Sequence, residues 1–82
     1  MNPWNRVNEM SEEIEISTDY IPLGQFLKLA NIVESGGMVK IFLAEFEVFV
    51  NGELENRRGR KLYVGDTVEI EEFGSYTVVH DG

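Results

Sequence analysis

The sequence predicts an α+β fold in which two packed helices lie against a small twisted antiparallel sheet of about four to five strands. Three observations lead to this class. Near the N-terminus a short stretch alternates apolar and polar residues, the next two stretches show helical spacing, and the remaining stretches are short, rich in β-formers and separated by turn dipeptides. A strand, two helices and then hairpins is an order typical of α+β domains.

The first strand and the first helix are predicted from the spacing of apolar residues. Ile14-Glu15-Ile16-Ser17-Thr18 alternates as a half-buried strand does, and we expect it at a sheet edge. A helix is predicted over roughly 22–32, with Pro22 in its first turn. One face of this helix would carry Leu23, Phe26, Leu27, Ala30 and Val33.

A second helix is predicted over about 37–46, after the break Ser35-Gly36-Gly37. Ser35 is suited to cap it, and a glycine would supply a hinge with positive φ. Its apolar residues cover more than half of its circumference, so we expect this helix to contact both the first helix and the sheet, at the centre of the core. These residues are Met38, Val39, Ile41, Phe42, Leu43 and Phe46.

The second half of the chain is predicted to form hairpins. Val48-Phe49-Val50 runs into Asn51-Gly52, the dipeptide most typical of a type I′ turn, and the chain returns through 53–55. Further strands are expected at 62–64, 67–71 and 76–79, separated by the turns Gly65-Asp66 and Phe73-Gly74-Ser75.

Length and composition limit the classes of protein. With 82 residues the chain has room for one domain, expected over 14–80 after a tail at 1–13 in which Trp4 could pack on the body. It contains no cysteine, its apolar runs are too short to span a membrane, and no signal pattern is present, so we expect a cytoplasmic protein. The single His80 is expected to be a solvated residue. We expect no catalytic residues, no metal site and no cofactor, because no nucleophile, histidine partner or phosphate-binding fingerprint accompanies the carboxylates.

Charge is distributed unevenly in this chain. Its formal net charge is −8, yet four of its seven Lys and Arg residues lie in the stretch NRRGRK at 56–61, which we call the basic loop. Arg57, Arg58, Arg60 and Lys61, with Asn56 as an amide donor and Gly59 allowing close backbone approach, suit a phosphate-binding loop. The alternative is a solvated loop whose cations pair with acidic neighbours such as Glu53, Glu55 or Glu71.

Two further pairs of residues admit two interpretations each. Gly36 and Gly37 could let the backbone N–H groups of a helix N-terminus approach a phosphate, or could form a simple interhelical hinge. Tyr63 and Phe73 could stack on an exposed base, although their strand positions favour packing in the core.

The order and spacing of several motifs resemble those of the S-four-type RNA-binding domain, or αL motif, named after a small-subunit ribosomal protein. The phrasing LGQFLKLA, VFVNGE and NRRGRKLYVGD is similar to that of its small stand-alone YaaA-like, or YbcJ-like, bacterial group. The match runs from Leu23 to Ile70. It is carried by Leu23, Leu27, Ser35, Val48, Val50, Asn51, Gly52 and the stretch Gly65-Asp66-Thr67-Val68-Glu69-Ile70.

The resemblance implies that RNA binds to the face of the helix pair and the adjoining strand and loop, which adds Lys28 and Lys40 to the basic loop as candidates. This chain departs from the family where Pro22 and Gly36 replace customary arginines and Gly24 replaces a customary aspartate. Two usual phosphate-contacting positions are therefore vacant, and the basic loop would supply most of the contact.

We therefore predict a non-catalytic, monomeric module that binds structured RNA, either ribosomal or transfer RNA, with a possible ribosome-related role. The candidate RNA-binding residues are Lys28, Gly36, Gly37, Lys40, Asn56, Arg57, Arg58, Gly59, Arg60 and Lys61. The rival hypothesis is a protein-interaction module in which the basic loop docks on an acidic partner. A third is an accessory domain that acts in trans with an RNA-modifying enzyme.

Overall fold

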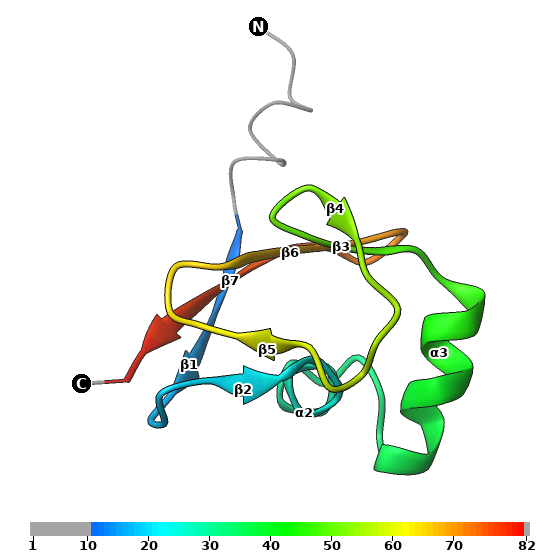
Figure 1. Cartoon of the computed structure of the whole chain (residues 1–82), viewed down its shortest axis with the longest axis horizontal. Helices are drawn as coiled ribbons and strands as arrows, with labels where there is room; N and C mark the ends of the chain where they lie inside the picture. Colours follow the sequence, from blue (N-terminus) through cyan, green and yellow to red (C-terminus); the bar gives the residue numbers. More distant parts are fainter. Residues whose placement is uncertain (1–10, 82) are drawn as a thin grey trace, which may run out of the picture.

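The computed structural model describes residues 11–81, in which two helices, joined through a short 3-10 helix, lie on one side of a sheet (Figure 1). Trp4 and the rest of the expected tail up to residue 10 lie outside the described residues. The elements are β1 (Glu12–Ile16), β2 (Ile21–Pro22), α2 (Leu23–Leu29), η1 (Gly36–Met38), α3 (Val39–Glu45), β3 (Val48–Val50), β4 (Glu53–Leu54), β5 (Lys61–Leu62), β6 (Thr67–Ile70) and β7 (Gly74–His80). The α+β class is confirmed, and β1 begins at Glu12, inside the stretch expected to be a tail.

The main sheet has five strands in the order β1-β7-β6-β3-β4. The pairs β3-β4, β3-β6 and β6-β7 are antiparallel, but β1 pairs with β7 in parallel, with Ile14 opposite Val78. The sheet is therefore mixed, and the expectation of a wholly antiparallel sheet was wrong for this pair. Turn dipeptides reveal only strands that are neighbours in sequence, whereas β1 and β7 come from opposite ends of the chain. The edge position expected for the first strand is correct.

A second, two-stranded sheet is formed by β2 and β5, with Ile21 opposite Leu62. The sequence predicted one sheet, because nothing local shows that Ile21-Pro22 is extended. In Figure 1 these two strands lie side by side next to α2. Since the basic loop leads directly into β5 and α2 directly follows Pro22, this small sheet brings the loop to the start of α2.

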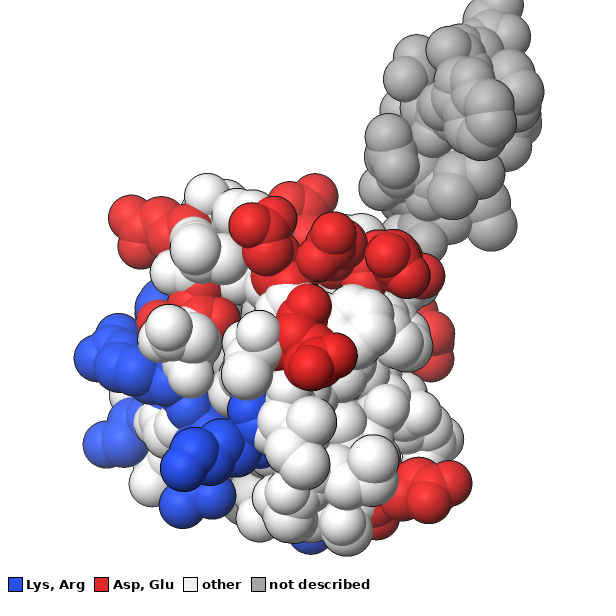
Figure 2. All heavy atoms as spheres, turned by 90° about the vertical axis from the view of Figure 1, so that its right-hand side faces the viewer, with Lys and Arg blue, Asp and Glu red and all other residues white. Residues whose placement is uncertain are grey.

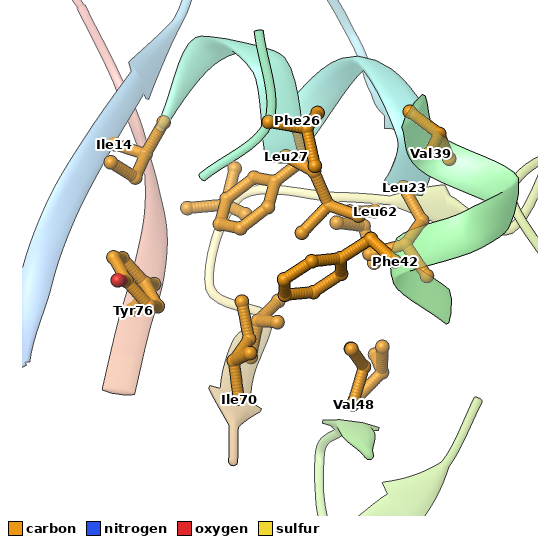
Figure 3. Close-up of a cluster of buried hydrophobic side chains, with 14 of the residues drawn as sticks. Ile14, Leu23, Phe26, Leu27, Val39, Phe42, Val48, Leu62, Ile70 and Tyr76 are labelled. Carbon is orange, nitrogen blue, oxygen red and sulfur yellow. The ribbon is translucent and has the colours of Figure 1, made fainter. Parts of the chain in front are cut away.

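The core lies between the helices and one face of the main sheet (Figure 3). Alternate residues of β1, β3, β6 and β7 point into it, such as Val68 and Ile70 of β6. Helix α2 contributes Leu23, Phe26 and Leu27, all fully buried. Thus α2, not the second helix, is the centre of the core.

Helix α3 was expected to be the centre of the core, and this expectation was wrong. It buries only Val39 and Phe42, while the side chain of Ile41 is 62% exposed and that of Met38, just before it, 46% exposed. Its apolar residues lie on two faces, and the small domain covers only one of them. The other face is left to solvent.

Local hydrogen bonds explain where the elements end. Helix α2 stops at Leu29 because Asn31 adopts a positive φ of 62°, and the N–H groups of Asn31 and Ile32 turn back to the carbonyls of Lys28 and Leu27. The predicted type I′ turn is present, with φ of 51° at Asn51 and 86° at Gly52. Asn51 also joins the two turn motifs, since its Nδ2 donates to Asp66 and its Oδ1 accepts from the Thr67 N–H.

Candidate functional site

The basic loop is organised around one buried carboxylate, that of Glu55, which is only 7% exposed. Glu55 Oε2 accepts hydrogen bonds from the backbone N–H of Arg57 at 3.0 Å and from its Nε at 2.9 Å. Glu55 Oε1 accepts from Arg57 Nη2 at 3.1 Å and from Arg60 Nη1 at 2.8 Å. The loop is thereby closed on itself, and an Arg57 carbonyl to Arg60 N–H bond of 3.1 Å completes the turn.

These bonds shift the protonation equilibria of the partners. The hydrogen bond from Arg57 is the main cause that lowers the pKa of Glu55 to about 2, and burial of the carboxyl opposes it. The same hydrogen bond raises the pKa of Arg57. Glu55 is therefore ionised throughout the physiological range, and two of the loop's four cations are held by it.

The backbone of the basic loop is fixed to the start of α2. The Leu23 N–H donates to the Arg60 carbonyl at 2.8 Å, and the Gly24 N–H donates to the Arg58 carbonyl at 2.9 Å. A Cβ atom at Gly24 would lie 3.3 Å from Val39 Cγ1 and 3.5 Å from the Arg58 carbonyl oxygen. Glycine at this position thus lets the loop, α2 and α3 approach closely, which accounts for one departure from the family pattern.

Two surface hollows meet at Arg58. One, of about 380 Å³, is lined by Lys40, Leu43 and Ala44 of α3 together with Asn56 and Arg58. The other, of about 290 Å³, lies between α2, η1 and the loop. Its lining residues are Pro22, Gly24, Gln25, Lys28, Gly36, Val39, Arg58 and Gly59.

The cations around these hollows are available to a ligand. Within residues 11–81, no carboxylate lies within ion-pairing distance of Lys28, Lys40 or Arg58. Figure 2, which views the molecule from the α3 side, shows Lys and Arg atoms gathered at the lower left and Asp and Glu atoms mostly along the top and the right. The site combines free positive charge with concave shape, as an anionic ligand requires.

Comparison with known proteins identifies the family of this chain. A protein-family model described as "S4 domain" matches residues 14–79. The chain belongs to the S4 domain family. A Bacillus subtilis protein named "Probable ribosome maturation protein RlbA" is 65% identical over 71 residues, which cover 87% of this chain and all of that protein. "Putative RNA-binding protein YbcJ" of Escherichia coli is 39% identical over 51 residues, 62% of this chain and 73% of that protein.

The S4 domain brings together six of the ten residues singled out from the sequence. Lys28, Gly36, Lys40, Asn56, Arg58 and Gly59 line the two hollows. Arg57 and Arg60 are bound to Glu55, so the alternative of pairing with acidic neighbours is correct for these two, although the carboxylate is buried rather than solvated. Lys61 Nζ lies 4.9 Å from the ring centroid of Tyr20.

The Gly36-Gly37 segment of this S4 domain differs from expectation. It forms the 3-10 helix η1, and neither glycine has a positive φ, so the predicted hinge conformation was wrong. Ser35 stands at the N-cap position without a side-chain hydrogen bond to the helix. Gly36 contributes to a hollow, whereas Gly37 lines neither.

Two residues of the site region were not found from the sequence. Glu55 was considered only as a surface partner, because a single acidic residue before a basic run gives no sign of burial. Tyr20 lies in no recognisable motif, and its ring centroid is 6.0 Å from that of Tyr63. The side chains of Tyr63 and Phe73 are 49% and 45% exposed, so the expectation that they pack in the core was wrong. Phe73 instead covers the outside of Phe42 and Phe46.

Residues 11–81 contain no group of three or more His, Cys, Asp or Glu side chains placed to hold a metal ion. In the same part of the chain, no helix is both long and apolar enough to cross a membrane. His80 lies at the end of β7 with its Nδ1 3.9 Å from the Asp81 carboxylate.

Proposed function

We propose that this S4 domain is a monomeric, non-catalytic module that binds structured RNA, and that its target is ribosomal RNA during maturation of the ribosome. The observation that carries the proposal is the convergence of Arg58, Lys28 and Lys40 on two adjoining hollows of an otherwise acidic molecule. The names of RlbA and YbcJ, which refer to ribosome maturation and RNA binding, support it. Binding to ribosomal RNA would take place in the cytoplasm.

The chemistry of the three cations fits an RNA backbone. The guanidinium of Arg58 can donate two parallel hydrogen bonds to one phosphate, and the ammonium groups of Lys28 and Lys40 can each neutralise a further phosphate. Their separation over α2, α3 and the loop allows contacts to phosphates on different parts of a folded RNA. Such a pattern recognises shape rather than base sequence.

The acidic remainder of the surface would make binding selective. With a net charge of −8, the protein repels polyanions at long range, whereas its cations act within a Debye length of about 8 Å at physiological salt. An RNA must therefore fit the hollows before it gains favourable contacts. Loose attraction to any nucleic acid is suppressed.

The experiment is capture of ribosomal particles by the tagged protein from a lysate, before and after ribonuclease treatment. Without ribonuclease, we expect ribosomal RNA to be captured together with ribosomal proteins, and this RNA to be unaltered in length. After ribonuclease, we expect the ribosomal proteins to be lost. Arg58→Gln combined with Lys40→Gln should reduce capture, and Arg58→Lys is the matched control that keeps the charge. Partners retained after ribonuclease would instead support docking on an acidic protein.

A further inference from the structure

Besides the two hollows, the small sheet carries an exposed pair of tyrosines that the proposed phosphate contacts leave unused. The rings of Tyr20 and Tyr63 lie 6.0 Å apart at an interplanar angle of 46°. The pairing of Ile21 with Leu62 and of Pro22 with Lys61 puts Tyr20 and Tyr63 opposite each other, at the end of the sheet away from the basic loop. Their side chains are 39% and 49% exposed.

The fold determines on which face of the small sheet these rings lie. Leu62 is fully buried, and because successive side chains of a strand point to opposite faces, its neighbours Lys61 and Tyr63 point to solvent on the same side. The Tyr63 N–H donates to Asp66 Oδ2 at 2.8 Å, and the Asp66 N–H donates back to the Tyr63 carbonyl at 2.9 Å. The backbone of Tyr63 is thus fixed just after β5, and Tyr20 lies opposite it just before β2.

A cation completes the arrangement. Lys61 Nζ lies 4.9 Å from the centre of the Tyr20 ring, and within the described part of the chain it has no carboxylate partner. Because Tyr63 is two residues from Lys61, the cation and both rings lie on one face of the small sheet. An aromatic face next to a cation matches a nucleobase next to its own phosphate.

We propose that Tyr20 and Tyr63, with Lys61, form a stacking site for an unpaired nucleobase of the RNA. The inference rests on the proposed function. It specifies the ligand further, as structured RNA with a single-stranded nucleotide beside the stem. The cations around the hollows would bind the phosphates of the RNA stem, and the tyrosine pair would stack on an unpaired base next to that stem. A simple cross-strand aromatic pair that only stabilises the small sheet is the competing interpretation.

The test compares two RNA hairpins with the same stem, one blunt and one with a short adenosine extension that contains a fluorescent purine analogue. We expect the extended hairpin to bind about tenfold more tightly, the usual effect of one stacked base, with quenching of the analogue. Tyr63→Leu should remove both effects and leave binding of the blunt hairpin unchanged, whereas Tyr63→Phe should keep them. Unchanged binding of the blunt hairpin also shows that the variant is folded.

The outcomes separate this inference from the proposed function. If both hairpins bind equally, with salt-sensitive affinity and no quenching, the stacking site is wrong and the phosphate contacts stand. If Tyr63→Leu keeps the advantage of the extension, the base stacks elsewhere and the assignment to these tyrosines is overturned. If neither hairpin binds and ribosomal RNA does not bind either, both proposals fail.

Discussion

The arginines of the basic loop fall into two groups that differ in what holds them. Arg57 and Arg60 donate to the buried carboxylate of Glu55, whereas Arg58, between them in sequence, points to the two hollows and has no ion pair within residues 11–81. Arg57 and Arg60 neutralise Glu55 and hold the loop together. The charge of Arg58 is left for a ligand. Four neighbouring cations in a sequence are thus not four equivalent binding residues.

The largest effect expected from this difference is on stability. Glu55→Gln should lower the free energy of unfolding by about 1–3 kcal/mol, because an amide offers one acceptor and turns its own donors toward the guanidinium groups. Chemical denaturation followed by circular dichroism measures the change. A loss below about 0.5 kcal/mol would mean that the buried carboxylate does not organise the loop.

The effect of Glu55 should depend on pH in a defined direction. Its pKa is lowered from 4.5 to about 2 on folding, so its contribution is complete above pH 4.5 and fades as the pH falls toward 2. The difference in unfolding free energy between the wild type and Glu55→Gln should therefore be constant at neutral pH and shrink in acid. Denaturation curves at several pH values check this, and a difference that grows in acid would contradict it.

For the second group we expect a loss of binding without a loss of stability. Arg58→Gln should weaken binding to ribosomal RNA by about tenfold, the cost of a charge-assisted contact, while the unfolding free energy changes by less than about 0.5 kcal/mol. Filter binding and denaturation of the same preparation give both values. Arg58→Lys is the control, and it should retain more of the affinity than Arg58→Gln.

The smallest effect is expected from Arg60→Gln, which removes the less exposed of the two arginines that bind Glu55. The Arg60 side chain is 27% exposed, and it makes one of the bonds to Glu55. Arg60→Gln should cost about 1 kcal/mol of stability, less than Glu55→Gln, because Arg57 still pairs with the carboxylate. Equal losses for Arg60→Gln and Arg58→Gln would remove the distinction between the two groups.

The sequence predicted the elements that depend on local patterns. Alternation of apolar and polar residues predicted β6, and the Asn51-Gly52 dipeptide predicted the turn between β3 and β4. The spacing of Leu23, Phe26 and Leu27 predicted the buried face of α2. The parallel pairing of β1 with β7 could not be predicted, because no local signal links strands from opposite ends of a chain. Helix α3 was misjudged for a related reason, since apolar content does not show which face the rest of the domain covers.

The sequence predicted the cations of the candidate site, but not which of them bind Glu55 and which line the hollows. The charge of the basic loop and the family resemblance were enough to select Lys28, Lys40 and Arg58. That Arg57 and Arg60 bond to Glu55 depends on the burial of Glu55, which follows from the Glu55 N–H to Val48 carbonyl bond just after β4. Replacing all four cations of the loop with alanine would therefore confuse loss of binding with loss of loop structure.

The salt dependence of binding to ribosomal RNA tests the central claim most directly. If Arg58, Lys28 and Lys40 each neutralise one phosphate, log affinity should fall with log salt concentration with a slope of about −2 to −3, and Arg58→Gln should reduce the slope by about one. A slope near zero for the wild type would contradict binding through these cations. A slope that Arg58→Gln leaves unchanged would contradict the central position of Arg58 between the two hollows.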